Sequence, residues 1–163
     1  MDGRSKQDEL SLPFFVYGTL LPGQPNAFLW QGLETNVENA LFSNGRLHDL
    51  GGYPILVETG TQPVKGNVIT IAPDFYQVVL SRLDLLEGFD PARPDAPGYR
   101  RVMREVRLEN GRSPSAWVYV GQLEWVNGRV AIPNGDWSAY TRQQNPAHTP
   151  VDPIEYHFAQ PDF

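Results

Sequence analysis

The sequence predicts an α+β fold with several short strands and one main helix. Short apolar runs bounded by glycine and proline recur along the chain, and such runs are typical of buried strands. Fifteen glycines and fifteen prolines among 163 residues favour many turns. Within residues 74–87, apolar side chains recur at the helical spacings of three and four, at Phe75, Val78, Val79, Leu83 and Leu86. The polar, solvated face of this amphipathic pattern contains Gln77, Ser81, Arg82 and Asp84. A chain of this length fits one domain, which buries roughly 70% of its unfolded surface.

Composition and charge exclude several classes of function. The net charge of −6, from 13 basic and 19 acidic residues, argues against nucleic acid as a partner, since phosphate backbones require clustered Lys and Arg. The chain has no cysteine, so thiol nucleophiles, disulfides and cysteine metal sites are excluded. No stretch is long enough to span a bilayer, and residues 1–11 lack the apolar core of a signal peptide. The sequence therefore predicts a cytoplasmic protein without a membrane partner.

The first apolar run, residues 14–17, predicts a buried strand that ends in a tight loop. Gly18, Thr19 and Leu20 form this loop, and Leu21-Pro22-Gly23 follows them. Gly18 has no Cβ, so the backbone can approach a ligand closely, and successive N–H groups can converge on an anion or a carbonyl oxygen. The alternative is an ordinary corner between a strand and a turn.

The remaining elements are predicted by periodicity and turn residues. A short helix is expected from Gln24-Pro25-Asn26 to Trp30, ended by Gly32. Further strands are expected at residues 35–50, 55–57, 64–71, 99–108 and 116–120, with a small hairpin within 125–132. Residues 1–12 are expected to form a lead-in, residues 13–140 the domain, and residues 141–163 an extended or partly disordered tail.

The clearest helix, residues 74–87, ends in an acidic residue on its apolar side. Pro73 suits a helix start, and Gly88 is expected to take the left-handed conformation that ends the helix. Glu87 lies one turn after Leu83, so its carboxylate shares the apolar stripe. Burial and the helix dipole would raise its pKa from about 4.3, which suits a proton-transfer residue. The alternative is a solvated glutamate, or one paired with an arginine among Arg100, Arg101 and Arg104.

Five short motifs, in this order, resemble those of the gamma-glutamylcyclotransferase-like family. They lie at residues 17–20, 51–54, 83–88, 99–102 and 116–120, and the similarity covers about residues 13–121. This resemblance implies a small mixed, barrel-like β-sheet with one main helix packed against it. It also implies a small-molecule gamma-glutamyl substrate that cyclises to 5-oxoproline with release of its amine, without a cofactor.

The resemblance also implies roles for particular residues. Tyr17, Gly18, Thr19 and Leu20 would form the loop that holds the substrate, Glu87 would be the general acid/base, and Tyr119 would flank the pocket. The Thr19-Leu20 form of the loop resembles the branch associated with gamma-glutamyl amines. The three histidines, His48, His148 and His157, lack the paired spacing of zinc enzymes, so no metal site is predicted. A binding or accessory module with the same fold but no turnover is the alternative function.

Overall fold

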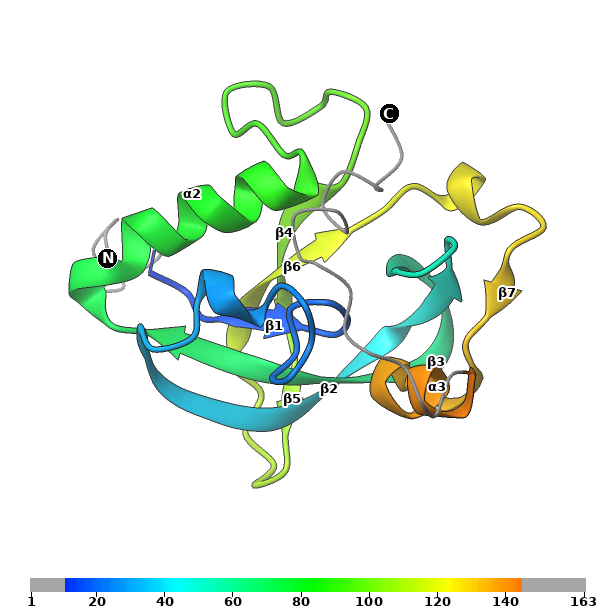
Figure 1. The fold of residues 1–163 in the computed structure, drawn as a ribbon, viewed down its shortest axis with the longest axis horizontal. Helices are drawn as coiled ribbons and strands as arrows, with labels where there is room; N and C mark the ends of the chain where they lie inside the picture. The colour runs from blue at the N-terminus through cyan, green and yellow to red at the C-terminus, as the bar shows by residue number, and fades with distance from the viewer. Residues whose placement is uncertain (1–10, 145–163) are drawn as a thin grey trace.

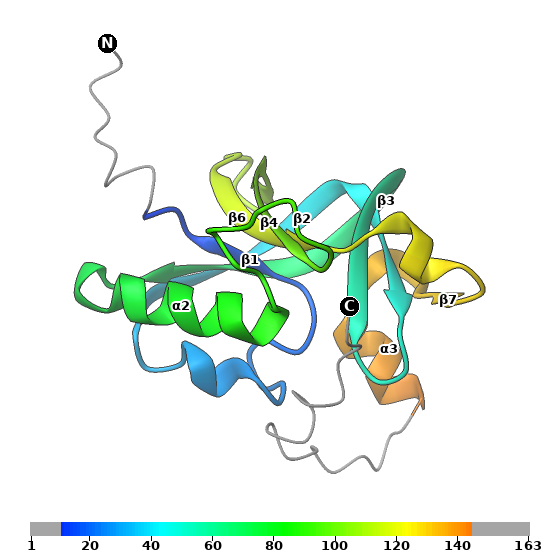
Figure 2. The same cartoon turned by 90° about the horizontal axis from the view of Figure 1, so that it is seen from above.

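The computed structural model describes residues 11–144 and confirms the α+β class (Figure 1). Its seven-stranded sheet follows the order β4-β6-β1-β3-β2-β5, with β7 paired to β2. Strands β4 and β5 are the two edges of this order and do not pair with each other, so the barrel-like sheet does not close. Figure 2 shows α2 along one side of the sheet and α3 at the far end of the molecule from it.

Strand β1 (Phe14–Val16) lies in the middle of the sheet and is buried along its whole length. It pairs antiparallel with β3 (Pro54–Ile71) and parallel with β6 (Ser115–Val120). A strand covered on both faces requires a continuous apolar run, which is what its three residues provide. The loop that follows β1 is therefore attached to a buried strand with a partner on each side.

The long antiparallel pair of β2 (Glu34–Asp49) and β3 corrects one prediction from the sequence. The strands expected at residues 55–57 and 64–71 were predicted to be separated by a turn marked by Gly60 and Pro63, but β3 runs through both residues. The ladder is irregular there, with register shifts on either side of Gly45, and Pro63 pairs with no residue of β2. A proline is tolerated at such a bulge because its missing N–H removes no ladder bond.

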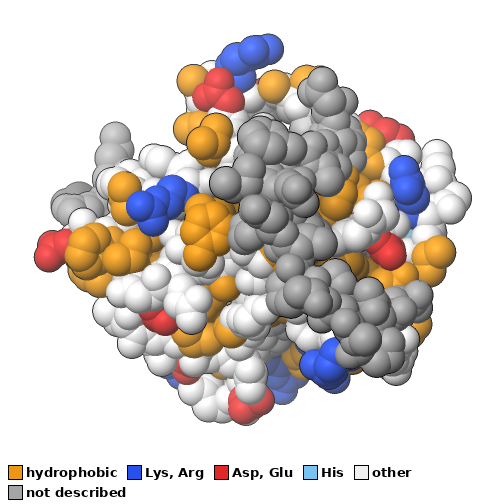
Figure 3. Space-filling model, viewed as in Figure 1, with side chains coloured by type: hydrophobic (Ala, Val, Ile, Leu, Met, Phe, Trp, Pro, Cys, Tyr) orange, Lys and Arg blue, Asp and Glu red, His pale blue; other side chains and the backbone are white. Residues whose placement is uncertain are grey.

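Helix α2 (Tyr76–Glu87) follows the short 3-10 helix η2 (Pro73–Phe75) and packs one face on the sheet. The buried face consists of Tyr76, Val79, Leu83, Asp84 and Leu86. Phe75 and Val78 were assigned to this face by periodicity, but they are 45% and 47% exposed. Hydrophobic side chains accordingly gather at the left of the surface in Figure 3, over the first half of α2.

The remaining elements are short. They are η1 (Ala27–Leu29), β4 (Arg100–Glu105), β5 (Arg107–Leu108), η3 (Leu123–Val126), β7 (Val130–Ala131), η4 (Pro133–Gly135) and α3 (Trp137–Gln144). Because α3 crosses residue 140, residues 141–144 are helical instead of extended. The rest of the predicted tail lies outside the described residues. Within residues 11–144, no helix is long and apolar enough to cross a membrane.

Candidate active site

A narrow pocket lies where the loop after β1 meets the end of α2. It is lined by Phe15, Val16, Tyr17, Gly18, Thr19, Leu20, Tyr53, Pro54, Glu87, Tyr99 and Tyr119. The structure therefore brings together all six residues that the sequence singled out. Glu87 is the single acidic side chain of this lining.

Glu87 is the last helical residue of α2, and the backbone fixes its position. Gly88 adopts the predicted left-handed conformation, with φ of 72°. The N–H of Phe89 donates to the carbonyl of Asp84 at 2.9 Å, and the N–H of Gly88 donates to that of Leu85 at 3.2 Å. This pair of bonds is a Schellman motif, which satisfies the last carbonyls of the helix. The carboxylate is thus held by a well-defined helix end.

Glu87 is half-buried as a residue, and its carboxyl group has a strongly raised pKa. Burial, and secondarily the negative charge of Asp84, raise its pKa from 4.5 to about 8. No described residue forms an ion pair or a hydrogen bond with it, so the alternative of an arginine-paired glutamate is wrong for residues 11–144. Arg101 instead pairs with Asp84, and Arg104 with Glu58.

The loop after β1 is anchored through its carbonyl groups. The carbonyl of Gly18 accepts from the N–H of Leu21 at 3.0 Å, and that of Thr19 from the N–H of Asn26 at 2.9 Å. The carbonyl of Leu20 accepts from the indole N–H of Trp30 at 2.8 Å. The N–H groups of Gly18, Thr19 and Leu20, by contrast, donate to no acceptor among the described residues. The loop that lines the pocket thus contains three N–H groups without a described acceptor, whereas the carbonyls of the same three residues are all bonded.

The side chains of Thr19 and Leu20 point into the protein. Both are buried, and the Thr19 hydroxyl accepts a hydrogen bond from Asn26 Nδ2 at 3.1 Å. Any contact between these two residues and a ligand is therefore expected to run through the backbone. A substrate-binding role for them remains a prediction, now attached to their amides.

Gly18 is required by its neighbour in the fold. A Cβ at this position would lie 2.3 Å from Cγ and 2.9 Å from Cδ of Pro54. Real Cβ atoms do not approach other atoms so closely, so the proline ring excludes every other residue type in this geometry. The structure shows that the missing Cβ makes room for Pro54. The close approach of a ligand to this backbone, expected from the sequence, remains a prediction.

Two phenol groups link the loop to the sheet beside Glu87. The Tyr17 hydroxyl donates to the backbone carbonyl of Tyr119 at 2.7 Å. The Tyr119 hydroxyl donates to Asp84 Oδ1 at 2.6 Å. Burial is the main cause that raises the pKa of both phenols well above 10. The negative charge of Glu87 raises the pKa of Tyr17 further, and that of Asp84 raises the pKa of Tyr119 further. Both tyrosines are therefore neutral at physiological pH.

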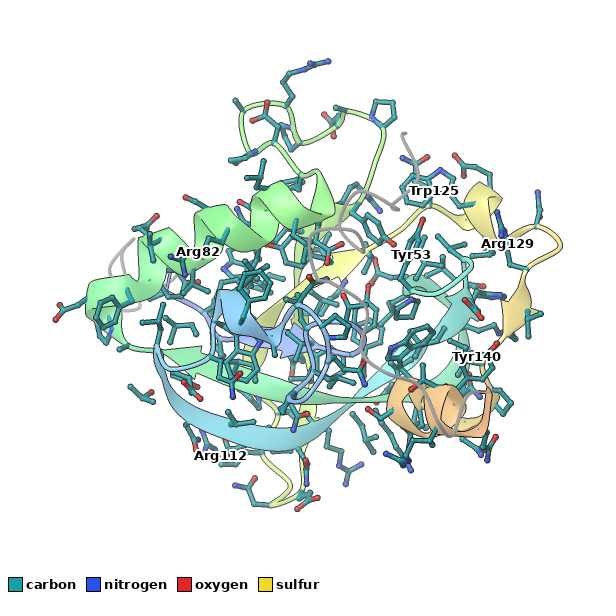
Figure 4. The ribbon with its side chains drawn as sticks, viewed as in Figure 1. Tyr53, Arg82, Arg112, Trp125, Arg129 and Tyr140 are labelled. Atoms are coloured by element: carbon teal, nitrogen blue, oxygen red, sulfur yellow. The ribbon has the colours of Figure 1, made fainter. Side chains whose placement is uncertain are left out.

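Sequence reasoning missed two further aromatic residues of the pocket, Tyr53 and Tyr99. Tyr99 packs edge-on against Trp125, with ring centroids 5.4 Å apart. Burial raises the pKa of Tyr53 to about 12, with smaller effects from Arg129 and Glu87. In the view of Figure 4, Tyr53 lies between Trp125 and Tyr140. Both tyrosines belong to motifs that carry the family resemblance, at residues 51–54 and 99–102. Their place in these motifs was the sequence signal that could have identified them as pocket residues.

The turn that presents Tyr53 is held by a carboxylate. Asp49 Oδ1 accepts from the N–H groups of Gly51 and Gly52 at 2.8 and 2.9 Å, and Oδ2 accepts from the Tyr140 hydroxyl at 2.8 Å. The two glycines have φ of 104° and 118°, a region that favours glycine. The turn therefore depends on both glycines and on α3.

The cavity is small, with a volume of about 20 Å³. This is room for about one water molecule, whereas pockets that enclose small ligands measure about 300 Å³ or more. A ligand larger than a water molecule therefore requires this pocket to widen. Within residues 11–144, no group of three His, Asp or Glu side chains is placed to hold a metal ion.

The anchoring of the loop leads to a testable expectation for Asn26. Replacing Asn26 with Ala removes a buried amide and leaves the Thr19 hydroxyl without its donor, which should cost about 1–3 kcal/mol of stability. The loop amides should also lose their fixed direction, so ligand affinity should fall. Chemical denaturation and ligand titration measure the two effects. Asn39→Ala, which removes exposed bonds to Glu109 and Asn67 at a residue outside the pocket lining, is the matched control. Equal behaviour of the two variants would contradict the anchoring role.

Fold and site together define a small α+β protein whose pocket joins a weakly acidic carboxyl group to backbone donors. The family model "Gamma-glutamyl cyclotransferase, AIG2-like" matches residues 14–139. A Vibrio cholerae relative, named "Putative gamma-glutamylcyclotransferase", is 36% identical over 130 residues, which cover 76% of this chain and 92% of that protein. The chain therefore belongs to the AIG2-like gamma-glutamyl cyclotransferase family.

Solved structures show the same fold. Protein ytfP from Escherichia coli is 30% identical with a TM-score of 0.52, and the match covers 77% of this chain and 96% of that one. An aig2-like protein from Mus musculus is 24% identical with a TM-score of 0.53, and the match covers 71% and 82% of the two chains. The likeness to the mouse protein concerns the fold alone.

Proposed function

We propose that this protein cyclises a gamma-glutamyl amine or gamma-glutamyl peptide to 5-oxoproline and releases the amine, with Glu87 as general acid/base. The observation that carries the proposal is the single carboxyl group with a pKa of about 8 in a pocket that also contains three backbone donors without an acceptor among residues 11–144. Family membership supports a reaction of this kind.

The chemistry of the substrate matches these groups. The α-amine of a gamma-glutamyl group can attack its own γ-carbonyl and close a five-membered ring, so neither water nor an enzyme nucleophile is needed. Positioning converts this attack into an intramolecular step, and a proton must move from the attacking amine to the leaving amine. In the proposal, ionised Glu87 takes that proton and then delivers it to the leaving nitrogen.

The loop amides have a separate role in this mechanism. The N–H groups of Gly18, Thr19 and Leu20 would donate to oxygen atoms of the bent substrate. Such donors are most effective when they are already oriented before the reaction, because no energy is then spent on reorganisation. Their carbonyl groups are held by Leu21, Asn26 and Trp30, which supports this orientation.

The raised pKa of Glu87 predicts a pH dependence. The base is the ionised form, and with a pKa of about 8 its population falls roughly tenfold per pH unit below that value. We therefore expect kcat/KM to rise with pH to a midpoint near 8. A pH–rate profile measures this, with the amine pKa of the free substrate determined separately because that group titrates in the same range. A profile already flat from pH 6 upward would contradict the assignment.

The proposed reaction is tested by product analysis. The protein is incubated with gamma-glutamyl amines, gamma-glutamyl dipeptides and glutathione, and 5-oxoproline is measured by mass spectrometry. We expect at least one compound to yield 5-oxoproline and free amine in equal amounts. Ligand binding without product from any compound would refute the catalytic proposal and favour the binding module.

A further inference from the structure

A second acidic residue, Asp84, lies beside the pocket but outside its lining. It is three residues before Glu87, so the two carboxylates lie on the same side of α2. Its residue surface is only 6% exposed, although the helical pattern assigned it to the solvated face. A carboxylate so deeply buried persists only when charge and hydrogen bonds compensate it.

Arg101 provides the compensating charge. Its Nε lies 2.8 Å from Asp84 Oδ1, and its Nη2 donates to Oδ2 at 3.3 Å. The guanidinium group is itself enclosed, since its central carbon lies 4.4 Å from the ring centroid of Trp117 and 5.2 Å from that of Phe89. Arg101 and Tyr119 are direct cross-strand partners in the β4–β6 ladder. The ion pair therefore fixes the end of α2 to this part of the sheet.

The hydrogen-bond directions in this cluster are determined by its acceptors. A phenol has one hydrogen, whereas a carboxylate and a carbonyl only accept. The Tyr119 hydrogen must therefore point to Asp84, and the Tyr17 hydrogen to the carbonyl of Tyr119. Neither of these two phenols can donate to Glu87 while these bonds persist.

We propose that Asp84 is a positioning residue for the cyclisation: by holding the hydroxyl hydrogen of Tyr119, it keeps this donor away from Glu87. This inference rests on the proposed function. The α-ammonium group of a gamma-glutamyl substrate carries three N–H donors, and the arrangement offers it the Glu87 carboxylate and the lone pair of the Tyr119 hydroxyl. Without Asp84, the Tyr119 hydrogen can turn to Glu87, compete with the ammonium group and weaken the base.

The charges around Glu87 have to be separated from this effect. The titratable and charged groups in its surroundings are Asp84 on α2, Arg101 on β4, Tyr119 on β6, Tyr17 after β1, and Tyr53 and Tyr99 in the pocket lining. The negative charge of Asp84 raises the pKa of Glu87, so removing that charge lowers this pKa even if no phenol hydrogen moves. A test must therefore distinguish a freed phenol hydrogen from a lost charge.

The test is a ¹³C NMR titration of the Glu87 carboxyl group in the unliganded protein. Asp84→Leu, which removes both the charge and the acceptor, should lower the titration midpoint by about one pH unit or more. The double variant Asp84→Leu/Tyr119→Phe has lost the same charge but has no phenol hydrogen, so its midpoint should lie above that of Asp84→Leu. Equal midpoints in the single and double variants would reduce the effect to charge alone and overturn the proposal.

A matched control and a single variant complete the test. Glu58→Gln removes an exposed carboxylate from its pair with Arg104, and the midpoint of Glu87 should not move. If Asp84→Leu does not fold, Tyr119→Phe with Asp84 intact remains informative. Because the Tyr119 hydroxyl gives its hydrogen to Asp84, the midpoint of Glu87 should move by much less than one pH unit, and a rise of about one unit or more would show a lost bond to Glu87 and contradict the proposal. None of these measurements requires turnover, so their failure is distinct from failure of the proposed reaction.

Discussion

Glu87→Gln is expected to lower kcat by about 10² to 10⁴-fold, the contribution typical of a general acid/base. Glutamine keeps the shape of the side chain but cannot accept the proton of the attacking amine. Substrate binding through the loop amides should persist, so the dissociation constant should change much less than kcat. Steady-state kinetics and ligand titration measure the two quantities. A folded variant with full activity would refute the role of Glu87.

The stability of the same variant provides a control on its folding. Below about pH 4.5, Glu87 is protonated in both the folded and the unfolded chain and has no pH-dependent effect. As pH rises from 4.5 to about 8, the unfolded chain ionises while the folded chain retains its proton, so this group destabilises the fold increasingly. Above pH 8, the destabilisation of the fold by this group is constant. Glu87→Gln should therefore gain melting temperature relative to wild type across this window; a loss would indicate a structural role.

Gly18→Ala is expected to produce the second largest effect. The new Cβ would lie 2.3 Å from Pro54 Cγ, so the loop or the proline must move. Overpacking of this kind costs about 1–3 kcal/mol of stability. A displacement of the loop amides by about 1 Å can reduce the rate on the order of 10²-fold. Thermal unfolding and kcat/KM measure the two losses.

A second substitution, at Pro54, is expected to restore the stability and activity that Gly18→Ala loses. Pro54→Ala removes Cγ and Cδ, whereas the Pro54 Cβ lies at an ordinary 3.7 Å from the position that an alanine methyl would take at residue 18. The double variant Gly18→Ala/Pro54→Ala should therefore recover much of the stability and activity lost in the single variant, relative to Pro54→Ala alone. If the double variant shows no recovery, contact with Pro54 is not the reason for glycine at position 18.

The parts of the site that local sequence patterns describe could be predicted. Helical spacing placed Glu87 on the apolar side of its helix, and Gly88 predicted where the helix ends. The loop at Gly18 was predicted because a buried run followed by glycine and a turn is a local signal. In each case, the residues that determine the feature lie within one helix, strand or turn.

The parts that depend on distant contacts could not be predicted. Asp84 occupies one polar position of an amphipathic helix, and nothing in the periodicity shows that Arg101, across a proline-rich loop, neutralises it in the core. The continuity of β3 through Gly60 and Pro63 depends on its irregular pairing with β2, which turn residues alone do not reveal. Phe75 and Val78 fit the helical stripe, yet the sheet covers other residues of α2.

The most direct test of the account is the isotopic composition of the product formed in H₂¹⁸O. The wild-type protein is incubated with the gamma-glutamyl compound that gives the highest turnover, and the acyl product is analysed by mass spectrometry. Intramolecular attack by the α-amine predicts 5-oxoproline without ¹⁸O. Glutamate carrying ¹⁸O would show that water attacks the γ-carbonyl, and would contradict the central claim that this pocket catalyses a cyclisation.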